Sequence, residues 1–368
     1  MNLKAFHQAI LKWYDAHGRK NLPWRTFDTP LCDERLQGIN AAYGVYISEI
    51  MLQQTQVNRV LEHFYFPFLK KFPNLTSLSN ADESELLKAW QGLGYYSRAR
   101  NLKLCASECV AKFDGVLPSE VSELRKLKGI GTYTAGAIAC FGYKKAVSFI
   151  DGNIKRVFSR LFALSSPTQR ELEAKASKLL YKQNAFDYNQ ALIDLGALVC
   201  TPKGAKCGIC PLYEFCAGKF APQKYPQNKK VEYEKLNLSL LVACFKGKIA
   251  IQKSTQKLYK GLYNLPQIDD ELAKKCKIGA KKACKFIGEF KHAYTKYRLN
   301  VRVYECVFDE TAQNACGWTL TREQNGTNLA FFKECLKACE FVSLHALRGL
   351  PLSNLAVKAL KKAFKDEI

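Results

Sequence analysis

The sequence of 368 residues lacks any run of about 18 uncharged apolar residues, so it predicts no membrane-spanning helix. Residues 1–20 also lack the apolar stretch and small-residue cleavage site of a secretion signal. Acidic side chains are scarce beside basic ones, at 33 against 56. These absences predict a cytoplasmic protein with no membrane partner, associated with the nucleoid if its source is bacterial.

The surplus of positive charge, +23 at pH 7, is spread over the whole chain. Residues 1–224 carry +11, from 30 basic and 19 acidic side chains, and residues 225–368 carry +12, from 26 and 14. Such a distribution favours a polyanionic partner, with nucleic acid ahead of a membrane. Solubility alone is the alternative explanation.

The length allows two domains, each with its own core. Apolar residues recur at helical spacing in residues 81–90 and 122–142, whereas residues 236–245, 247–253 and 296–308 are rich in strand formers. A polar, basic stretch at residues 221–230 separates the two patterns, and residues 355–364 predict a closing helix. We therefore expect a multidomain chain: an all-α domain at residues 1–222, a linker at 223–233 and an α+β domain at 234–368.

Fifteen cysteines in a cytoplasmic protein do not predict a disulfide framework, and most are interpreted as small buried apolar residues. Cys200, Cys207, Cys210 and Cys216 differ because they lie within 17 residues. An iron–sulfur cluster, a zinc ion and a chance grouping are all compatible with this spacing. Zinc sites usually use two close cysteine pairs, and the single pair here favours the cluster.

Gly129 and Gly131 join two helical patterns in the segment LKGIGTYTAG. Two glycines allow a tight turn, and the following helix then offers free backbone N–H groups to a DNA phosphate. An ordinary connection between helices is the alternative, since a G-x-G pattern is weak by itself.

Four stretches together resemble the helix-hairpin-helix, GPD-type DNA glycosylases. They are LPWR (22–25), SEIMLQQTQV (48–57), the run from LKGIGTYTAG to DGNIKRV (127–157), and the cysteine segment. Within that superfamily the chain is similar to the adenine DNA glycosylases of the MutY family, which remove adenine mispaired with 8-oxoguanine. The resemblance covers residues 5–222 and extends more weakly through the second domain. It implies one 4Fe–4S cluster on the four cysteines, and a monomer that acts on double-stranded DNA.

The resemblance implies a catalytic pair of carboxyl groups, as in sugar hydrolysis. Glu49 would protonate N7 of adenine, and the apolar residues before it in the sequence favour a raised pKa. Asp151 would stabilise the sugar cation, and it also suits the N-cap of a helix that begins at DGNIKRV. Asn153 would support the catalytic water.

Tyr133 stands where the related endonuclease III enzymes carry the lysine that forms a Schiff base with DNA. A tyrosine supplies no amine for that step. We therefore expect a monofunctional glycosylase, with Tyr133 lining the adenine pocket. Lys128 is close in sequence but lies within the hairpin.

The remaining site residues follow from the resemblance alone. Gln54, Thr55 and Tyr95 would contact DNA near the lesion, while Trp24, Arg25 and Gln190 would frame the extruded adenine, although Trp24 also suits a core. The second domain is similar to a Nudix fold without its glutamate cluster, so pyrophosphate hydrolysis is not expected. Its 8-oxoguanine-sensing loop would be Phe290, Lys291 and His292, where lysine replaces the family's hydroxyl residue.

Two departures and two alternatives remain. The connector between Trp24 and Glu49 is longer than in the family and is expected to form a surface excursion, and Lys128 replaces a proline. An endonuclease III-like glycosylase and lyase acting on oxidised pyrimidines is the first alternative function. A non-catalytic protein that binds damaged DNA is the second.

Overall fold

The computed structural model describes residues 2–227, 232–256, 259–275, 277–278, 281–282, 284–294, 296–308 and 336–364. The chain divides into two compact units, residues 1–81 with 97–229 and residues 82–96 with 230–368. The division near residue 230 falls within the predicted linker at 223–233. The grouping of residues 82–96 with the second unit was not part of the prediction.

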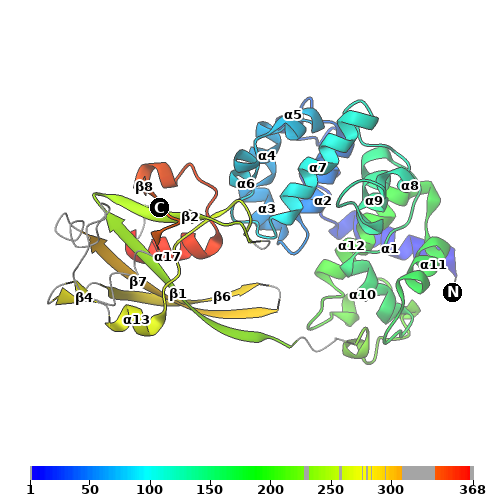
Figure 1. Cartoon of the computed structure of the whole chain (residues 1–368). Helices are drawn as coiled ribbons and strands as arrows, with labels where there is room; N and C mark the ends of the chain where they lie inside the picture. Colours follow the sequence, from blue (N-terminus) through cyan, green and yellow to red (C-terminus); the bar gives the residue numbers. More distant parts are fainter. Residues whose placement is uncertain are drawn as a thin grey trace. The chain divides into compact units, whose positions relative to one another are not determined.

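Helices build the first unit, as the sequence predicts (Figure 1). They are α1 (Leu3–His17), α2 (Ala41–Met51), α3 (Val57–His63), α4 (Tyr65–Lys71), α5 (Leu75–Asn80), α7 (Ser97–Lys112), α8 (Val121–Leu124), α9 (Thr132–Ala137), α10 (Gly152–Leu161), α11 (Gln169–Leu179) and α12 (Ala185–Leu198). Short helical turns connect them: η1 (Pro23–Arg25), η2 (Glu34–Leu36), η3 (Ile138–Gly142), η4 (Lys182–Asn184), η5 (Cys207–Ile209), η6 (Tyr213–Phe215) and η7 (Pro222–Lys224). Helix α6 (Glu83–Ala89) lies in the segment 82–96. No helix in the described residues is long and apolar enough to cross a membrane.

Short polar side chains fix the first residues of two helices of the first unit, α2 and α12. The Asn40 side chain accepts a hydrogen bond from the backbone N–H of Tyr43 at the start of α2. Asn184 caps α12 in the same way. Such caps satisfy N–H groups that have no partner within the helix, and so they fix its first residue.

Helix α2 is the central helix of the first unit. Its residues from Ala42 to Met51 are all buried, including the polar Ser48 and Glu49. A helix that is buried on every face is surrounded by packed elements rather than lying on the surface. Glu49 is therefore held in a buried position by its helix.

The long connector between Trp24 and Glu49 is only partly the expected surface excursion. Residues 28–32 are exposed, but Phe27 and Leu36 are buried. A Cβ on Gly44 would lie 2.2 Å from the Phe27 ring, so the glycine lets this ring pack directly on α2. Arg35 stacks on the Phe66 ring at 3.5 Å. The connector is thus anchored at both ends.

The second unit contains a mixed sheet, in which the three predicted strands are β1 (Glu234–Phe245), β2 (Lys248–Lys253) and β7 (Tyr297–Phe308). The strands β3 (Tyr263–Asn264), β6 (Lys285–Tyr294) and β8 (Glu340–Ser343) were not predicted from the sequence. Among the described residues the order is β3-β2-β1-β7-β6, with β8 paired to β2. Strands β1 and β7 run parallel, and Lys246 and Gly247 close the β1–β2 hairpin with positive φ at both positions. The strands β4 (Lys277–Ile278) and β5 (Lys281–Lys282) pair antiparallel in a separate two-stranded sheet.

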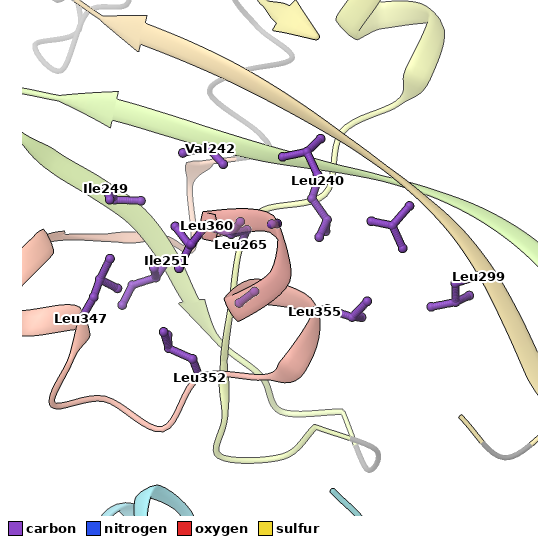
Figure 2. Close-up of a cluster of buried hydrophobic side chains, with 14 residues drawn as sticks. Leu240, Val242, Ile249, Ile251, Leu265, Leu299, Leu347, Leu352, Leu355 and Leu360 are labelled. Carbon is purple, nitrogen blue, oxygen red and sulfur yellow. The ribbon is translucent and has the colours of Figure 1, made fainter. Parts of the chain in front are cut away.

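Helix α17 (Asn354–Phe364) packs its apolar face on this sheet and confirms the predicted closing helix. Figure 2 shows Leu355 and Leu360 of the helix among Leu240, Val242 and the other buried side chains of the strands. The helices α13 (Asp270–Lys275) and α16 (Leu344–Leu347) complete the described part. The second unit therefore has the α+β architecture that the sequence predicts.

Candidate active site

A cavity of about 720 Å³ in the first unit is lined by residues of α2, α9, α10 and α12. All four predicted catalytic residues line it: Glu49, Tyr133, Asp151 and Asn153. Five predicted DNA or adenine contacts line it as well: Trp24, Arg25, Gln54, Thr55 and Gln190. The fold thus brings most of the predicted site residues to one cavity.

Glu49 is the buried acid of this cavity, with 6% of its surface exposed. Burial raises its pKa to about 7, and the nearby Asp151 carboxylate adds to the rise. A hydrogen bond from the Tyr133 hydroxyl and the charge of Arg25 act in the opposite direction. A carboxyl group with such a pKa is protonated in a large fraction of molecules at neutral pH, as a general acid requires.

Asp151 caps helix α10 and also faces the cavity. Its Oδ1 accepts a hydrogen bond of 2.6 Å from the backbone N–H of Ile154, and its Oδ2 accepts one of 2.8 Å from Asn153 Nδ2. Burial raises the pKa of this carboxyl group, while the hydrogen bonds from Ile154 and Asn153 favour its anion. The sequence left open whether Asp151 caps the helix or lines the site, and the structure places it in both positions.

Arg156 is a residue that the sequence prediction missed. Its Nη2 donates to Asn153 Oδ1 at 2.8 Å and to the Gly196 carbonyl at 2.6 Å, and its Nε donates to the Cys200 carbonyl at 2.7 Å. Asn153 is thereby held with its amide nitrogen toward Asp151. The spacing of Asn153 and Arg156 on one helix face was the available signal, but their partners were not visible in the sequence.

Arg25 is held by an ion pair that the sequence prediction also missed. Its guanidinium makes two bonds to Asp194, at 2.8 and 2.9 Å, and Arg19 bonds to the same carboxylate at 2.6 Å. Asp194 is fully buried, and both guanidinium groups contribute to lowering its pKa. Arg25 therefore lies at the cavity with a fixed orientation.

Gln54 and Tyr95 both have a left-handed backbone, with φ of 59° and 47°. This conformation costs energy for residues other than glycine, and such strain collects at functional sites. Gln54 lies in the first unit at the cavity wall, and Tyr95 lies in the segment grouped with the second unit, with 48% of its surface exposed. Trp24 is 5% exposed and packs edge-on against Tyr65, so it belongs to the core as well as to the cavity wall.

The glycine turn is a helix–hairpin–helix element between α8 and α9. Gly129 has φ of 79°, and a Cβ at this position would lie 2.6 Å from Asn101 Cβ. Glycine is therefore required both by the backbone conformation and by the lack of space for a side chain. Gly131 is the N-cap of α9 and has open space around it. Lys128 is exposed, and its backbone N–H bonds to Glu108.

Cys200, Cys207, Cys210 and Cys216 line one small cavity, and none of them forms a disulfide. Arg160 donates to Cys200 Sγ at 3.3 Å. No three His, Cys, Asp or Glu side chains in the described ranges are placed to hold a single metal ion.

The expectation of a loop at Phe290, Lys291 and His292 is wrong, because all three lie within strand β6. Side chains alternate between the faces of a strand. Phe290 packs on the α17 side, where Lys358 lies 5.6 Å from its ring, and Lys291 lines a groove on the opposite face. These three residues alone do not show that the strand continues to Tyr294.

Comparisons with known proteins agree with this geometry. Residues 47–182 match the family described as HhH-GPD superfamily base excision DNA repair protein. The adenine DNA glycosylase of Buchnera aphidicola subsp. Baizongia pistaciae (strain Bp) is 37% identical over 316 residues, which cover 82% of this chain and 86% of that protein. The adenine DNA glycosylase of Homo sapiens is 37% identical over 221 residues, covering 58% of this chain and 39% of that protein.

Among solved structures, that of a thermostable thymine-DNA glycosylase has a TM-score of 0.52 and 26% identity, and it covers 59% of this chain and 96% of its own. The helical fold and the site define the class, an HhH-GPD superfamily base excision DNA repair protein. The chain belongs, more narrowly, to the adenine DNA glycosylase family of enzymes.

Proposed function

We propose that this enzyme hydrolyses the N-glycosidic bond of adenine mispaired with 8-oxoguanine, or with guanine, in double-stranded DNA. The main support for the proposal is that Glu49 and Asp151 line the same cavity of the first unit. The base is inferred to be adenine because the similar proteins are named adenine DNA glycosylases. The mispaired partner comes from the resemblance to the MutY family.

The two carboxyl groups have different tasks because their surroundings differ. Glu49 is buried with a pKa of about 7, so its protonated form can donate a proton to N7 of an extruded adenine and improve the leaving group. Asp151 accepts hydrogen bonds that hold its anion beside the sugar. Burial destabilises this anion, and a cation developing next to it removes that penalty, so Asp151 stabilises the transition state more than the ground state.

A monofunctional reaction is supported by the lining of the cavity. Tyr133 occupies the position of the lyase lysine, and its hydroxyl donates to Glu49. No lysine is among the described residues that line this cavity. The adenine would be framed by Trp24, Arg25 and Gln190, while Gln54, Thr55 and Tyr95 would contact the duplex with the backbone amides after Gly129 and Gly131.

We also propose that the four cysteines hold one 4Fe–4S cluster. They are free thiols around one cavity, and Arg160 supplies a hydrogen bond to one sulfur, as cluster sites commonly use. When bound, the cluster would cross-link the loop at four points. The chain's own Arg156 and Arg160 hold the backbone of that loop at Cys200 and Thr201.

The second unit is proposed to be a Nudix-like domain that reads the base opposite adenine. Its mixed sheet with a packed helix supports the fold, and Phe290 and His292 remain the proposed contacts, now on one face of β6. The domain boundaries at residues 222 and 234, a monomeric state and a cytoplasmic or nucleoid location belong to the same proposal.

The test is base release from duplexes that contain one adenine opposite 8-oxoguanine, guanine or thymine. We expect strand cleavage at the adenine only after alkali, with the thymine-paired duplex intact, and no cleavage by Glu49→Gln. Cleavage without alkali would establish the lyase alternative. Binding without any release by the wild-type enzyme would establish a non-catalytic binding protein.

A further inference from the structure

Arg98 is a buried cation at the end of the helix that carries Glu49. It lies in the first turn of α7 and is 7% exposed. Its Nη1 donates to three backbone carbonyls: those of Ile50 at 2.7 Å, Met51 at 3.1 Å and Gln53 at 2.6 Å. A charged group buried in this way needs strong partners, and the three carbonyls provide them.

Two of these carbonyls belong to the last turn of α2, which ends at Met51. The final carbonyls of a helix have no partner inside the helix, and they carry the negative end of its dipole. Arg98 therefore caps α2 with both hydrogen bonds and charge. This fixes the end of the helix just after Glu49.

The third carbonyl fixes the backbone of the loop at residues 52–56. The Gln53 carbonyl lies in the peptide plane before Gln54 and the Thr55 N–H lies in the plane after it, so hydrogen bonds that hold both planes restrict the φ and ψ of Gln54. That φ is 59°, in the left-handed region. The Thr55 backbone N–H donates to the Leu52 carbonyl at 3.3 Å and closes the turn. The loop forms one wall of the catalytic cavity.

We propose that Arg98 is a positioning residue that holds Gln54 in its left-handed conformation and so prepares the loop for the duplex. Arg98 acts through the loop, since it lies outside the residues that line the cavity. A loop that samples other conformations binds DNA with an affinity reduced by the fraction of molecules in the competent form. The proposal rests on the proposed function only for the identity of the substrate.

Hydrogen exchange of the free protein tests the proposal without any activity. Arg98→Met keeps an unbranched side chain as far as the position of Nε and removes the guanidinium donors and the charge. We expect exchange at the Thr55 amide to become about tenfold faster or more, which corresponds to the cost of a left-handed residue, while α10 and α12 keep their protection. Arg125→Met, at an exposed arginine of the same unit, is the control and should change neither. Unchanged exchange at Thr55, or faster exchange throughout the unit, would overturn the proposal.

A double-mutant cycle tests whether Arg98 acts through Gln54 in the reaction. Glycine adopts the left-handed backbone without the cost, and release is measured with the enzyme below the dissociation constant of the duplex. The factor by which Arg98→Met slows single-turnover adenine release should then be about fivefold smaller in a Gln54→Gly background than in the wild type. Equal factors in both backgrounds would show a purely structural role. If Arg98→Met does not fold, Arg98→Lys enters the same series with the same criteria. A wild-type enzyme that releases no adenine would contradict the proposed function, and the exchange of Thr55 would still decide the role of Arg98.

Discussion

The buried acid of this enzyme should weaken the fold that contains it. The pKa of Glu49 is about 7 in the folded protein against an ordinary value of 4.5. Below pH 4.5 Glu49 is protonated in both the folded and the unfolded chain, so it does not change the free energy of unfolding. Between pH 4.5 and 7 the unfolded chain loses the proton first, so the folded state loses stability as the pH rises.

The size of the effect follows from the shift. A difference of 2.5 between 7 and 4.5, at 1.36 kcal/mol per pKa unit, is about 3 kcal/mol once the pH exceeds 7. Glu49→Gln keeps an acceptor for the Tyr133 hydroxyl and removes the ionisation. We therefore expect Glu49→Gln to stabilise the folded enzyme by about 3 kcal/mol at pH 8 and by much less at pH 5, although it abolishes activity.

Urea unfolding at pH 5 and pH 8, followed by far-ultraviolet circular dichroism, measures this difference, because the helical unit dominates that signal. Glu62→Gln is the matched control, since this carboxylate is exposed and should change stability by less than about 0.5 kcal/mol at either pH. An equal gain at both pH values would assign the effect to packing rather than to the proton. A loss of stability at pH 8 would refute the reasoning.

Three further predictions concern the same unit. Tyr133→Phe removes a hydrogen bond that favours the Glu49 anion, so the pKa of Glu49 should rise. The decline of single-turnover adenine release at high pH should then move upward by about one pH unit. An unchanged pH profile would contradict this role of Tyr133. Arg156→Ala should lower the single-turnover rate of adenine release about tenfold. The dissociation constant for the duplex, measured by fluorescence anisotropy, should stay within about twofold. If the rate and the affinity fell by the same factor, Arg156 would have no role at the catalytic carboxylate. Gly129→Ala should lower the free energy of unfolding of this unit in urea by about 2–3 kcal/mol, because Gly129 has a positive φ and lies close to Asn101. Gly131→Ala is the matched control, and because Gly131 has open space around it, stability should change by less than about 1 kcal/mol.

The prediction from sequence succeeded where a local pattern carries the information. The strand at residues 236–245, the glycine turn and the cap at Asp151 each depend on a few neighbouring residues, and all three are present. It failed at Phe290, Lys291 and His292, because a motif of three residues does not show whether it lies in a strand or in a loop. The buried anchors Phe27 and Leu36 in the long connector were missed for a related reason, since their burial depends on α2 and the elements around it.

The sequence by itself determined the chemistry that is available to this protein: two candidate carboxylates, a tyrosine in place of a lysine, four clustered cysteines and a surplus of positive charge. These are properties of residue type and spacing. Only the tertiary structure decided that Glu49 and Asp151 share a cavity, that burial raises the pKa of Glu49 as far as about 7, and that Asp194 and Arg98 anchor the groups around it. Burial and hydrogen bonding between residues far apart in the chain arise from the packing of the helices, which no local pattern specifies.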